Sequence, residues 1–429
     1  MSALRRTLGP FGAAGIGVAS MVGAGAFYVW APAAALAGSL LWVSLILAGT
    51  IALLNAVVMA QLTINNPVSG GAYRYGQKYI SPQAGFLAGW FFLVGKTASA
   101  AAISAVAGRY LWPENPTVVA VALVAVFALA NISGLRTTAA ISILIAVMVV
   151  GFLITTLLGA TGDVTAFALE GEVSAWGILP AAGLIFFAFA GYARMATLGE
   201  EVKNPATVLP RVIVLTLLGV LVLYGAIAFT LLGTLGAEAL ATSEAPLADI
   251  ATASMAPWVI AVAALASLGS LAAVLAGLSR TSMAMAQRGD LPSRLGVVWE
   301  RTSSPAIAET TMALGAIVAV IVVDPIWLVG ASSSAVLSYY AIAHAAAIKQ
   351  PESERILPVI TPWVGLVGCV GLVVTLPWQS VATGGVIFAA GLLVWALKKN
   401  QPSTIRRSPH SQLALRGTSA RKSCTHNPS

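Results

Sequence analysis

The sequence predicts an all-α membrane protein with twelve transmembrane helices, and three observations lead to this fold class. Of the 429 residues, 58% are hydrophobic and only 9% are charged, whereas soluble domains carry about 25% charged residues. The apolar residues gather in runs long enough for helices of roughly 17–25 residues to cross a bilayer. The runs do not alternate in polarity as barrel strands would, and a helix satisfies its own backbone groups in lipid.

The predicted helices follow one another along the chain with mostly short connections. The first run is long and rich in glycine and has no obvious cleavage site, so we interpret it as a retained helix and not as a signal peptide. In chain order, the twelve runs are Pro10–Ala37, Leu40–Leu62, Gln83–Leu111, Thr117–Ser133, Leu135–Gly159, Trp176–Gly199, Val208–Leu232, Trp258–Met285, Ile307–Val323, Pro325–Ile348, Ile356–Leu376 and Val381–Leu397.

Charged residues in the connections indicate which side of the membrane each connection faces. If residues 1–9 are cytoplasmic, every second connection and both termini are rich in lysine and arginine. The opposite connections hold acidic residues and one basic residue, Arg109. The positive-inside rule therefore predicts a multi-pass protein of the cell (inner) membrane with both termini in the cytoplasm. Residues 398–429 are basic and polar, and we expect them to form a disordered cytoplasmic tail.

The composition weighs against several other classes of function. The net charge of +8 comes from basic residues beside apolar spans, where they orient the protein, so we expect no nucleic-acid partner. Two cysteines and three scattered histidines suggest neither a metal site nor a cofactor. The predicted membrane core lacks Asp and Glu and has one histidine, His344, which we interpret as a packing residue. An intramembrane enzyme is therefore disfavoured, and a primary pump would need a phosphate-binding loop that we do not find.

Glycine interrupts the first and the sixth run. The first contains Gly23-Ala24-Gly25, and in the sixth Gly191 follows the aromatic stretch Phe186–Phe189. An unwound stretch frees backbone N–H and C=O groups, which are costly in lipid unless they line a cavity or bind a ligand. The freed N–H groups suit a carboxylate and the freed carbonyls suit an ammonium, so the pair could recognise the main chain of an amino acid. The alternative is that these glycines only allow close helix packing.

Several motifs resemble, in order, those of the amino acid–polyamine–organocation superfamily. The resemblance implies a leucine-transporter-type fold, in which helices 1–5 (residues 10–160) and helices 6–10 (residues 176–348) form an inverted repeat and helices 11 and 12 (residues 356–397) are added. The matching segments are Gly15–Phe27 in helix 1, Pro67–Tyr73 after helix 2, Phe186–Pro205 in and after helix 6, and Ser279-Arg280 with Gly289–Pro292 at the end of helix 8.

The resemblance also implies roles for individual residues. The carboxylate-binding backbone falls at Gly23, Ala24 and Gly25, and the carbonyls for the amino group fall at Met21, Ala190 and Phe187. Phe187, Phe189 and Tyr192 are candidates for an aromatic wall and a gate beside Gly191. Ser267 and Ser270 lie near the hydroxyl ligands of sodium-coupled relatives, and Glu200 with Glu201 is the candidate inner gate. The sequence departs from the family at Ala193, where many members have an acidic residue, and in helix 5, where Ile141–Val150 lacks a lysine.

Lys96 in helix 3 and Arg194 in helix 6 are the two cations that we place at bilayer depth, where charged groups are rare and usually functional. By the resemblance, Ala100 is a position that faces the substrate in some members, and Lys96 lies four residues earlier on the same helix face. A desolvated lysine can release its proton, so we hypothesise that Lys96 couples transport to protons. Alternatively, Lys96 tethers helix carbonyls, and Arg194 snorkels or caps the unwound segment.

Together these features predict a secondary active transporter of amino acids that works by alternating access around helices 1 and 6. Two buried cations without a buried anion favour a neutral amino acid. An anionic amino acid or an organic acid is the alternative substrate, and a non-transporting membrane solute sensor is the alternative function. Symport and exchange, proton and sodium coupling, and the oligomeric state stay open at the level of the sequence.

Overall fold

The structure, a computed structural model, describes residues 9–66, 70–134, 139–160, 175–192, 195, 202–299, 301–302 and 304–399. The chain divides into two compact units, residues 1–391 and 392–429, and the contacts described below lie within the first. The named elements of the described residues are α-helices and short 3-10 helices, which confirms the predicted all-α class.

The helices follow the predicted apolar runs. The α-helices are α1 (Pro10–Met21), α2 (Gly25–Tyr28), α3 (Trp30–Ala37), α4 (Leu41–Asn65), α5 (Ala72–Tyr79), α6 (Pro82–Leu111), α7 (Pro116–Ile132), α8 (Ala139–Leu158), α9 (Ile178–Phe189), α11 (Pro205–Thr242), α12 (Pro246–Asp249), α13 (Ala256–Gln287), α14 (Ala306–Val322), α15 (Pro325–Ile348), α16 (Ile360–Thr375) and α17 (Trp378–Lys399). The 3-10 helices are η1 (Gly38–Leu40), η2 (Ala175–Gly177), η3 (Ala190–Tyr192), η5 (Ser293–Gly296) and η6 (Glu352–Glu354).

Seven helical segments of the described residues are long and apolar enough to cross a membrane, and five shorter apolar helices accompany them. Each of the twelve predicted runs contains at least one of these helices. Large apolar side chains such as Leu129, Val222, Ile321 and Val367 are exposed on the outer faces of the helices. Such faces suit lipid, which makes no demand for polar partners.

The first run is interrupted as predicted and forms α1, α2 and α3, because the backbone leaves the helical conformation at Val22. Two elements differ from the predicted runs for identifiable reasons. The connection after the second run contains α5, whose polar outer residues hid it from a search for apolar runs. Helix 7 was predicted to end at Leu232, but α11 continues to Thr242 across a kink at Gly236, where φ is 74°.

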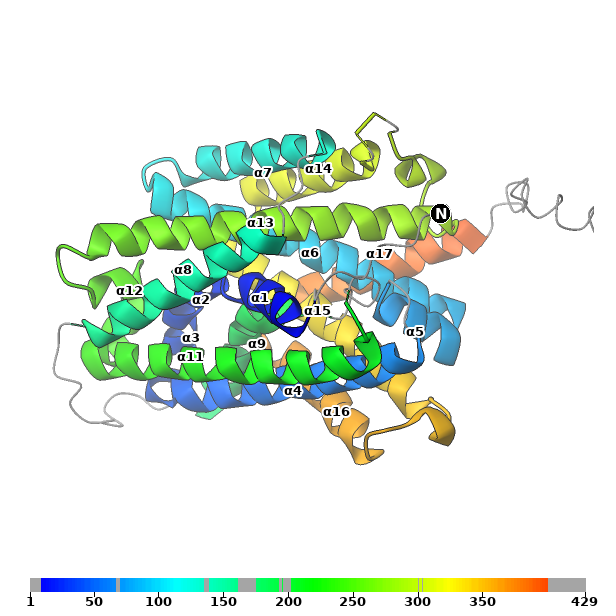
Figure 1. Ribbon diagram of the computed structural model, residues 1–429, viewed down its shortest axis with the longest axis horizontal. Helices are drawn as coiled ribbons and strands as arrows, with labels where there is room; N and C mark the ends of the chain where they lie inside the picture. Colours follow the sequence, from blue (N-terminus) through cyan, green and yellow to red (C-terminus); the bar gives the residue numbers. More distant parts are fainter. Residues whose placement is uncertain are drawn as a thin grey trace, which may run out of the picture. The chain divides into compact units, whose positions relative to one another are not determined.

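Among the seven long apolar segments of the described residues, α6 and α15 are the most buried, and they pack against one another and are rich in small residues. Side chains of alanine and serine let two helices approach closely in a membrane protein. Gly95 on α6 is an example, because a Cβ atom there would lie 2.9 Å from the Cβ of Ala335 on α15. Figure 1 shows α7 and α14 side by side on one flank, with α13 next to them.

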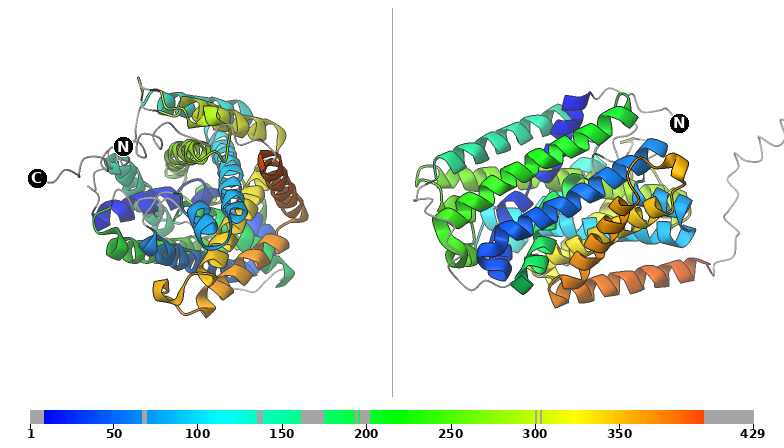
Figure 2. Two further views of the ribbon diagram at one scale, coloured as in Figure 1. Left: turned by 90° about the vertical axis from the view of Figure 1, so that its right-hand side faces the viewer. Right: turned by 90° about the horizontal axis from the view of Figure 1, so that it is seen from below.

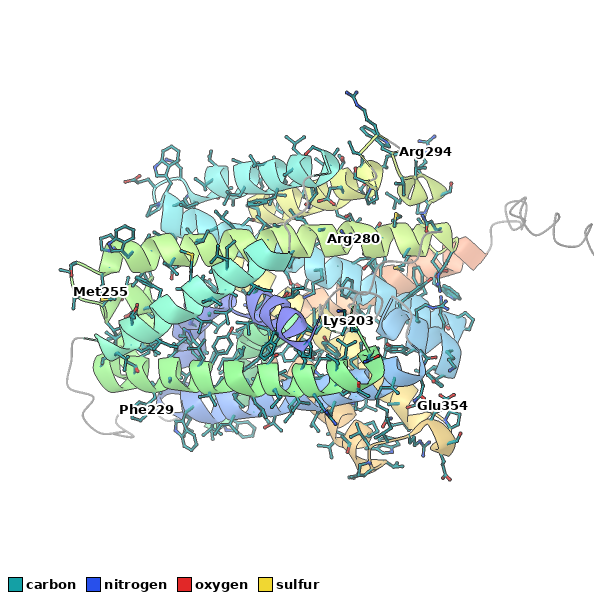
Figure 3. The ribbon with its side chains drawn as sticks, viewed as in Figure 1. Lys203, Phe229, Met255, Arg280, Arg294 and Glu354 are labelled. Carbon is teal, nitrogen blue, oxygen red and sulfur yellow. The ribbon has the colours of Figure 1, made fainter. Side chains whose placement is uncertain are left out.

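The two broken helices lie inside this framework. Within the first unit, α1 packs against α8, α11 and α13, and α9 packs against α3, α4 and α15. The view from below in Figure 2 shows α4 and α11 running alongside one another. Figure 3 shows Arg294 and Glu354 towards one end of the helices and Met255 towards the other. The elements that form the candidate site are therefore held by long helices on several sides.

Candidate functional site

The chain leaves the helical conformation at the predicted point in helix 1. α1 ends at Met21, and Val22 has a ψ of 71°, although its N–H still donates to the carbonyl of Val18. The N–H of Gly23 donates back to the Met21 carbonyl over 2.9 Å, and helix resumes at Gly25. Among the turn and loop hydrogen bonds of the described residues, the N–H groups of Ala24 and Gly25 donate none. Both residues are buried.

Helix 6 changes its winding at the corresponding point. α9 ends at Phe189, and the chain tightens into the 3-10 turn η3 from Ala190 to Tyr192. A 3-10 turn within a longer helix often marks a functional hinge or strain. Four residues of interest, Ala193, Arg194, Glu200 and Glu201, lie outside the described residues.

The two breaks touch one another through glycines. A Cβ atom on Gly191 would lie 1.8 Å from the carbonyl oxygen of Ser20, and a Cβ on Gly25 would lie 2.6 Å from the Cα of Ala188. These distances allow no side chain, because real Cβ atoms essentially never approach other atoms within 3.0 Å. Backbone therefore meets backbone where the two helices are interrupted. The break in helix 1 and the 3-10 turn at the end of α9 are thus in contact.

Tyr224 on α11 bridges the two breaks and was not identified from the sequence. Its hydroxyl lies 2.9 Å from the carbonyl oxygen of Met21 and 3.3 Å from that of Ala188. The ring is fully buried and packs edge-on against Trp30 and Phe189. A lone tyrosine within an aliphatic helix was the available signal, since a buried phenol usually finds a hydrogen-bond partner.

Lys96 reaches the break in helix 6. Its Nζ donates to the carbonyl oxygen of Ala190 over 3.1 Å, and the side chain is buried. Within the part of the chain that the structure describes, the one ion pair joins Lys78 and Glu354, so Lys96 has no carboxylate partner there. A buried ammonium is thus held by the carbonyl that an unwound helix leaves available.

The two candidate serines lie on α13 beside helix 1. Ser270 packs directly against Gly23, where a Cβ atom would lie 2.7 Å from the Ser270 side chain. The hydroxyl of Ser270 donates to the carbonyl of Ser267, and that of Ser267 donates to the carbonyl of Ala263. Both hydroxyl hydrogens are directed into their own helix, so both oxygens keep a lone pair for a further donor or a cation.

The three aromatic candidates of helix 6 take different positions. Phe189 is fully buried and packs against Tyr224 with ring centroids 5.1 Å apart. Tyr192 stacks on Tyr340 of α15 at 5.2 Å. Phe187 is 7% exposed and keeps more free surface than either. The structure thus places Phe189 and Tyr192 in packing contacts, and Phe187 is the candidate with the least enclosed ring.

Two of the motifs that resemble the superfamily meet at one end of the helices. The hydroxyl of Tyr73 on α5 donates to Asp290, which follows α13, and Gln77 donates to the same carboxylate over 3.2 Å. Burial, followed by the hydrogen bond to Asp290, raises the pKa of Tyr73 well above its usual value. The phenol therefore stays protonated and can keep donating.

One expectation about charge was wrong. No carboxylate was placed in the predicted spans, but Glu309 in the first turn of α14 is 2% exposed. The amide of Asn131 on α7 donates to its Oε1 over 2.8 Å, and Arg280 on α13 attracts it. The carboxylate lies at the start of a helix, where an acidic residue complements the helix dipole. Glu309 was overlooked because the predicted run around it is otherwise almost entirely apolar.

Comparison with known proteins agrees with this geometry. A family model described as amino acid permease matches residues 8–397. An uncharacterized transporter of Mycobacterium tuberculosis is 41% identical over 406 residues, which is 92% of each chain. The branched-chain amino acid permease BcaP of Bacillus subtilis is 25% identical over 448 residues, covering 94% of this chain and 95% of its own.

A further relative is the mitochondrial cationic amino acid transporter 3 of Arabidopsis thaliana, which is 28% identical over 353 residues, covering 73% of this chain and 57% of its own. The family match spans nearly all of the described helices, and with it the resemblance noted in the sequence is confirmed. This multi-pass membrane protein belongs to the amino acid permease family of the amino acid–polyamine–organocation superfamily.

Proposed function

We propose that this protein is a secondary active transporter that carries an amino acid through a site between the break in helix 1 and the break in helix 6. The observation that carries the proposal is the contact between the two breaks, where Gly191 meets Ser20 and Gly25 meets Ala188. The contact lies beside the end of α1 and the end of α9, where the N–H groups of Ala24 and Gly25 donate no turn or loop hydrogen bond among the described residues. In a membrane such backbone is tolerated where it lines a cavity or holds a ligand.

Recognition of the main chain follows from the groups at the break. The N–H groups of Ala24 and Gly25, together with that of Gly23, bind the carboxylate. The carbonyls of Met21 and Ala190, with that of Phe187, accept from the ammonium. In the described conformation, the Met21 carbonyl accepts from Tyr224 and the Ala190 carbonyl accepts from Lys96. An incoming ammonium therefore shares or displaces these donors.

Lys96 is the proposed coupling residue because it holds the same carbonyl that the substrate would use. Two ammonium groups beside one carbonyl repel one another strongly in a medium of low dielectric constant. Binding of the substrate's ammonium then favours release of the Lys96 proton to water on the open side. Arg194 adds to this repulsion, while Ser267 and Ser270 supply oxygens at helix 1. This arrangement supports proton coupling or exchange in place of sodium symport.

A neutral amino acid is the proposed substrate. Within the described residues, no carboxylate bonds to either break, so a cationic side chain would lack a partner. Phe187 and Phe189 form the aromatic wall for an apolar side chain, and Tyr192 forms the gate with Glu200 and Glu201. The relative from Bacillus subtilis is a branched-chain amino acid permease, which agrees with this class of substrate. An anionic amino acid or organic acid is the second candidate, since Lys96 could pair with its charge.

The proposed architecture has twelve membrane crossings in a bacterial cell membrane. Helices 1–5 and 6–10 form the inverted repeat, helices 11 and 12 follow it, and both termini are cytoplasmic. A helix in every predicted run supports the count, and a break in the first helix of each half supports the repeat. The bacterial sources of the similar transporters support the location.

Two measurements on the purified protein test this function. A thermal-shift screen against the twenty amino acids and simple organic acids should show stabilisation by a neutral amino acid, because a ligand that binds the folded state raises the unfolding temperature. Proteoliposomes should then accumulate that labelled amino acid when a proton gradient is imposed. Stabilisation without any uptake would indicate a solute sensor, and stabilisation by organic acids alone would favour the second substrate class.

A further inference from the structure

A second group of polar side chains lies buried beyond the helix breaks. Asn55 on α4, Tyr192 on η3, Tyr340 and His344 on α15, and Cys369 on α16 are each at most 1% exposed. We call these five residues the polar cluster. Tyr340 and His344 are four residues apart, so they project from the same face of α15. Apart from the proposed gate residue Tyr192, none of them has a part in the transport site described above.

The hydrogen bonds of Asn55 define the protonation of the cluster. Its Oδ1 accepts from the thiol of Cys369 over 3.1 Å and lies 2.7 Å from Nε2 of His344. An amide oxygen only accepts, so with this amide orientation Nε2 of His344 carries the hydrogen. The other ring nitrogen, Nδ1, then presents a bare lone pair to its surroundings.

Four polar atoms of the cluster lack a hydrogen-bond partner among the described protein atoms. They are Nδ2 of Asn55, Nδ1 of His344 and the hydroxyl oxygens of Tyr192 and Tyr340. The Tyr192 hydroxyl lies close enough to the hydroxyl of Tyr340 and the amide of Asn55 for a weak hydrogen-bonding interaction with each, but neither contact has the distance and angle of a regular hydrogen bond. Buried polar groups separated in this way are commonly bridged by water.

The chemistry of the four atoms selects water over an ion. The amide of Asn55 donates, Nδ1 of His344 accepts, and the two hydroxyls do either, which matches a molecule that both donates and accepts. The elements that carry the cluster, α4, α9 with η3, α15 and α16, contain no Asp, Glu, Lys or Arg. A cation or an anion would therefore find no opposite charge on them.

The described helices that pack on these elements bring no free charge to the cluster either. On α11, which packs against α4, Arg211 and Glu238 are exposed. Lys96 on α6 is held by the carbonyl of Ala190, and Arg109 on the same helix lies over the ring of Tyr28. On α5, Arg74 bonds to Gln77 and Lys78 pairs with Glu354. Asn55 and Gly365 of α16 lie against the ring of His344, and the other members of the cluster are neutral as well.

Tyr192 connects the cluster to the break in helix 6. It belongs to the 3-10 turn η3, whereas the other four residues belong to continuous helices. Its ring stacks on Tyr340, and Tyr340 in turn meets Phe186 of α9 edge-on at 6.3 Å. If the segment at the break moves, Tyr192 must separate from the other four residues.

We propose that Asn55, Tyr192, Tyr340 and His344 bind buried water, and that this hydrated network latches the break in helix 6 to α4 and α15. The water site stands independently of the substrate, whereas the latch rests on the proposed movement of helix 6 during transport. Water satisfies the four groups in the described conformation, and the bridges break when Tyr192 moves away.

The sign of a stability change tests the water site. The variants are Tyr192→Phe and Tyr340→Phe in the full-length protein, and the measurement is thermal unfolding. A buried hydroxyl without a partner is destabilising, so its removal would raise the unfolding temperature. If water holds the hydroxyl, removing the hydroxyl deprives that buried water of a hydrogen-bond partner. The unfolding temperature then falls. We expect the unfolding temperature of each variant to be lower by a few degrees. The double variant should lose less than the sum of the two single decreases, because the two hydroxyls share the network.

Tyr28→Phe is the matched control for the loss of a hydroxyl. Tyr28 on α2 is half-buried, and its ring faces Arg109, a contact that phenylalanine keeps. We expect its unfolding temperature to match that of the unchanged protein. If Tyr192→Phe and Tyr340→Phe are as stable as this control or more stable, the hydroxyls hold no water and the proposal is wrong.

The thiol of Cys369 reports on the latch. It is fully buried in the cluster, and the other cysteine, Cys424, is removed as Cys424→Ser for this experiment. Alkylation by N-ethylmaleimide should be several-fold faster in Tyr192→Phe than in Tyr28→Phe, because the weakened latch opens more often. A lower unfolding temperature together with an unchanged alkylation rate would refute the latch. A failure of transport itself would leave both readouts intact, since neither uses the substrate.

Discussion

Tyr224 on α11 places its hydroxyl oxygen 2.9 Å from the carbonyl oxygen of Met21, the residue at which α1 ends. The same hydroxyl lies 3.3 Å from the carbonyl oxygen of Ala188, close to the end of α9. The end of a helix leaves its last carbonyls without partners. A buried phenol from a third helix supplies a donor to both, and so an uncharged residue outside the two broken helices holds them in register.

Removal of the Tyr224 hydroxyl should therefore lower both the stability of the folded protein and the affinity of the site for its substrate. Tyr224→Phe keeps the ring contacts with Trp30 and Phe189 but leaves the two carbonyls without this donor. A buried hydrogen bond contributes about 0.5–1.5 kcal/mol net. We expect a lower unfolding temperature and a higher KM for uptake in proteoliposomes. Val222→Ala on the exposed face of the same helix is the control and should change neither.

The contact between the breaks makes a second prediction, at Gly191. Gly191→Ala would place a Cβ atom 1.8 Å from the Ser20 carbonyl, so the two breaks must move apart. We expect uptake to be lost or strongly reduced. Gly219→Ala on α11 is the matched control, because nothing lies within 4 Å of its Cβ position and alanine favours a helix by about 1 kcal/mol. Full uptake by Gly191→Ala would show that close contact of the breaks is not needed.

Lys96 should set the pH dependence of uptake. Lys96→Gln keeps a donor for the Ala190 carbonyl but has no proton to exchange, and Lys96→Ala removes both. We expect uptake by the two variants to depend much less on pH than uptake by the unchanged protein, measured over a range of pH values. Thr97→Val alters the neighbouring position on the same helix and should keep the original profile. If both lysine variants follow that profile as well, Lys96 does not couple transport to protons.

Glu354 gives a prediction about stability and pH at the end of the helices. The hydrogen bond from Tyr79 and the charge of Lys78 lower the pKa of its carboxyl below the usual value. A lowered pKa stabilises the folded protein above the unfolded-state value of about 4.3, and this stabilisation is lost as the pH falls through the folded-state value. Glu354→Gln should therefore unfold at a slightly lower temperature at pH 7.

The difference should shrink as the pH falls through the lowered pKa of the Glu354 carboxyl, because the carboxyl then becomes protonated in the unchanged protein too. It should be small throughout, since exposed ion pairs contribute little. Glu352→Gln, which alters an exposed residue of the same 3-10 helix η6, is the control. A difference of equal size at pH 7 and pH 3 would contradict the assignment to the charged carboxyl.

Much of the fold of this protein could be predicted from its sequence, because backbone polar groups in a lipid bilayer must be satisfied within the protein. Long apolar runs can only be helices in lipid, so the helical segments were predictable, and the break in helix 1 followed from Gly23-Ala24-Gly25. Lys96 stood out because a charge at bilayer depth is costly. Each of these signals lies within one stretch of chain, and none needs a neighbour in space.

The tertiary structure decided which residues meet. Tyr224 is 203 residues from Met21 along the chain, and Asn55 is 289 residues from His344, so no local pattern could pair them. The hydrogen bond between Glu309 and Asn131 joins two different helices, so no local pattern in the sequence indicated this pairing. Sequence by itself determined which stretches form apolar helices and where the first of them is interrupted, since those depend on local polarity and on glycine. Packing of distant helices decided which polar atoms are satisfied at the breaks, because hydrogen bonds require atoms within about 3 Å of one another.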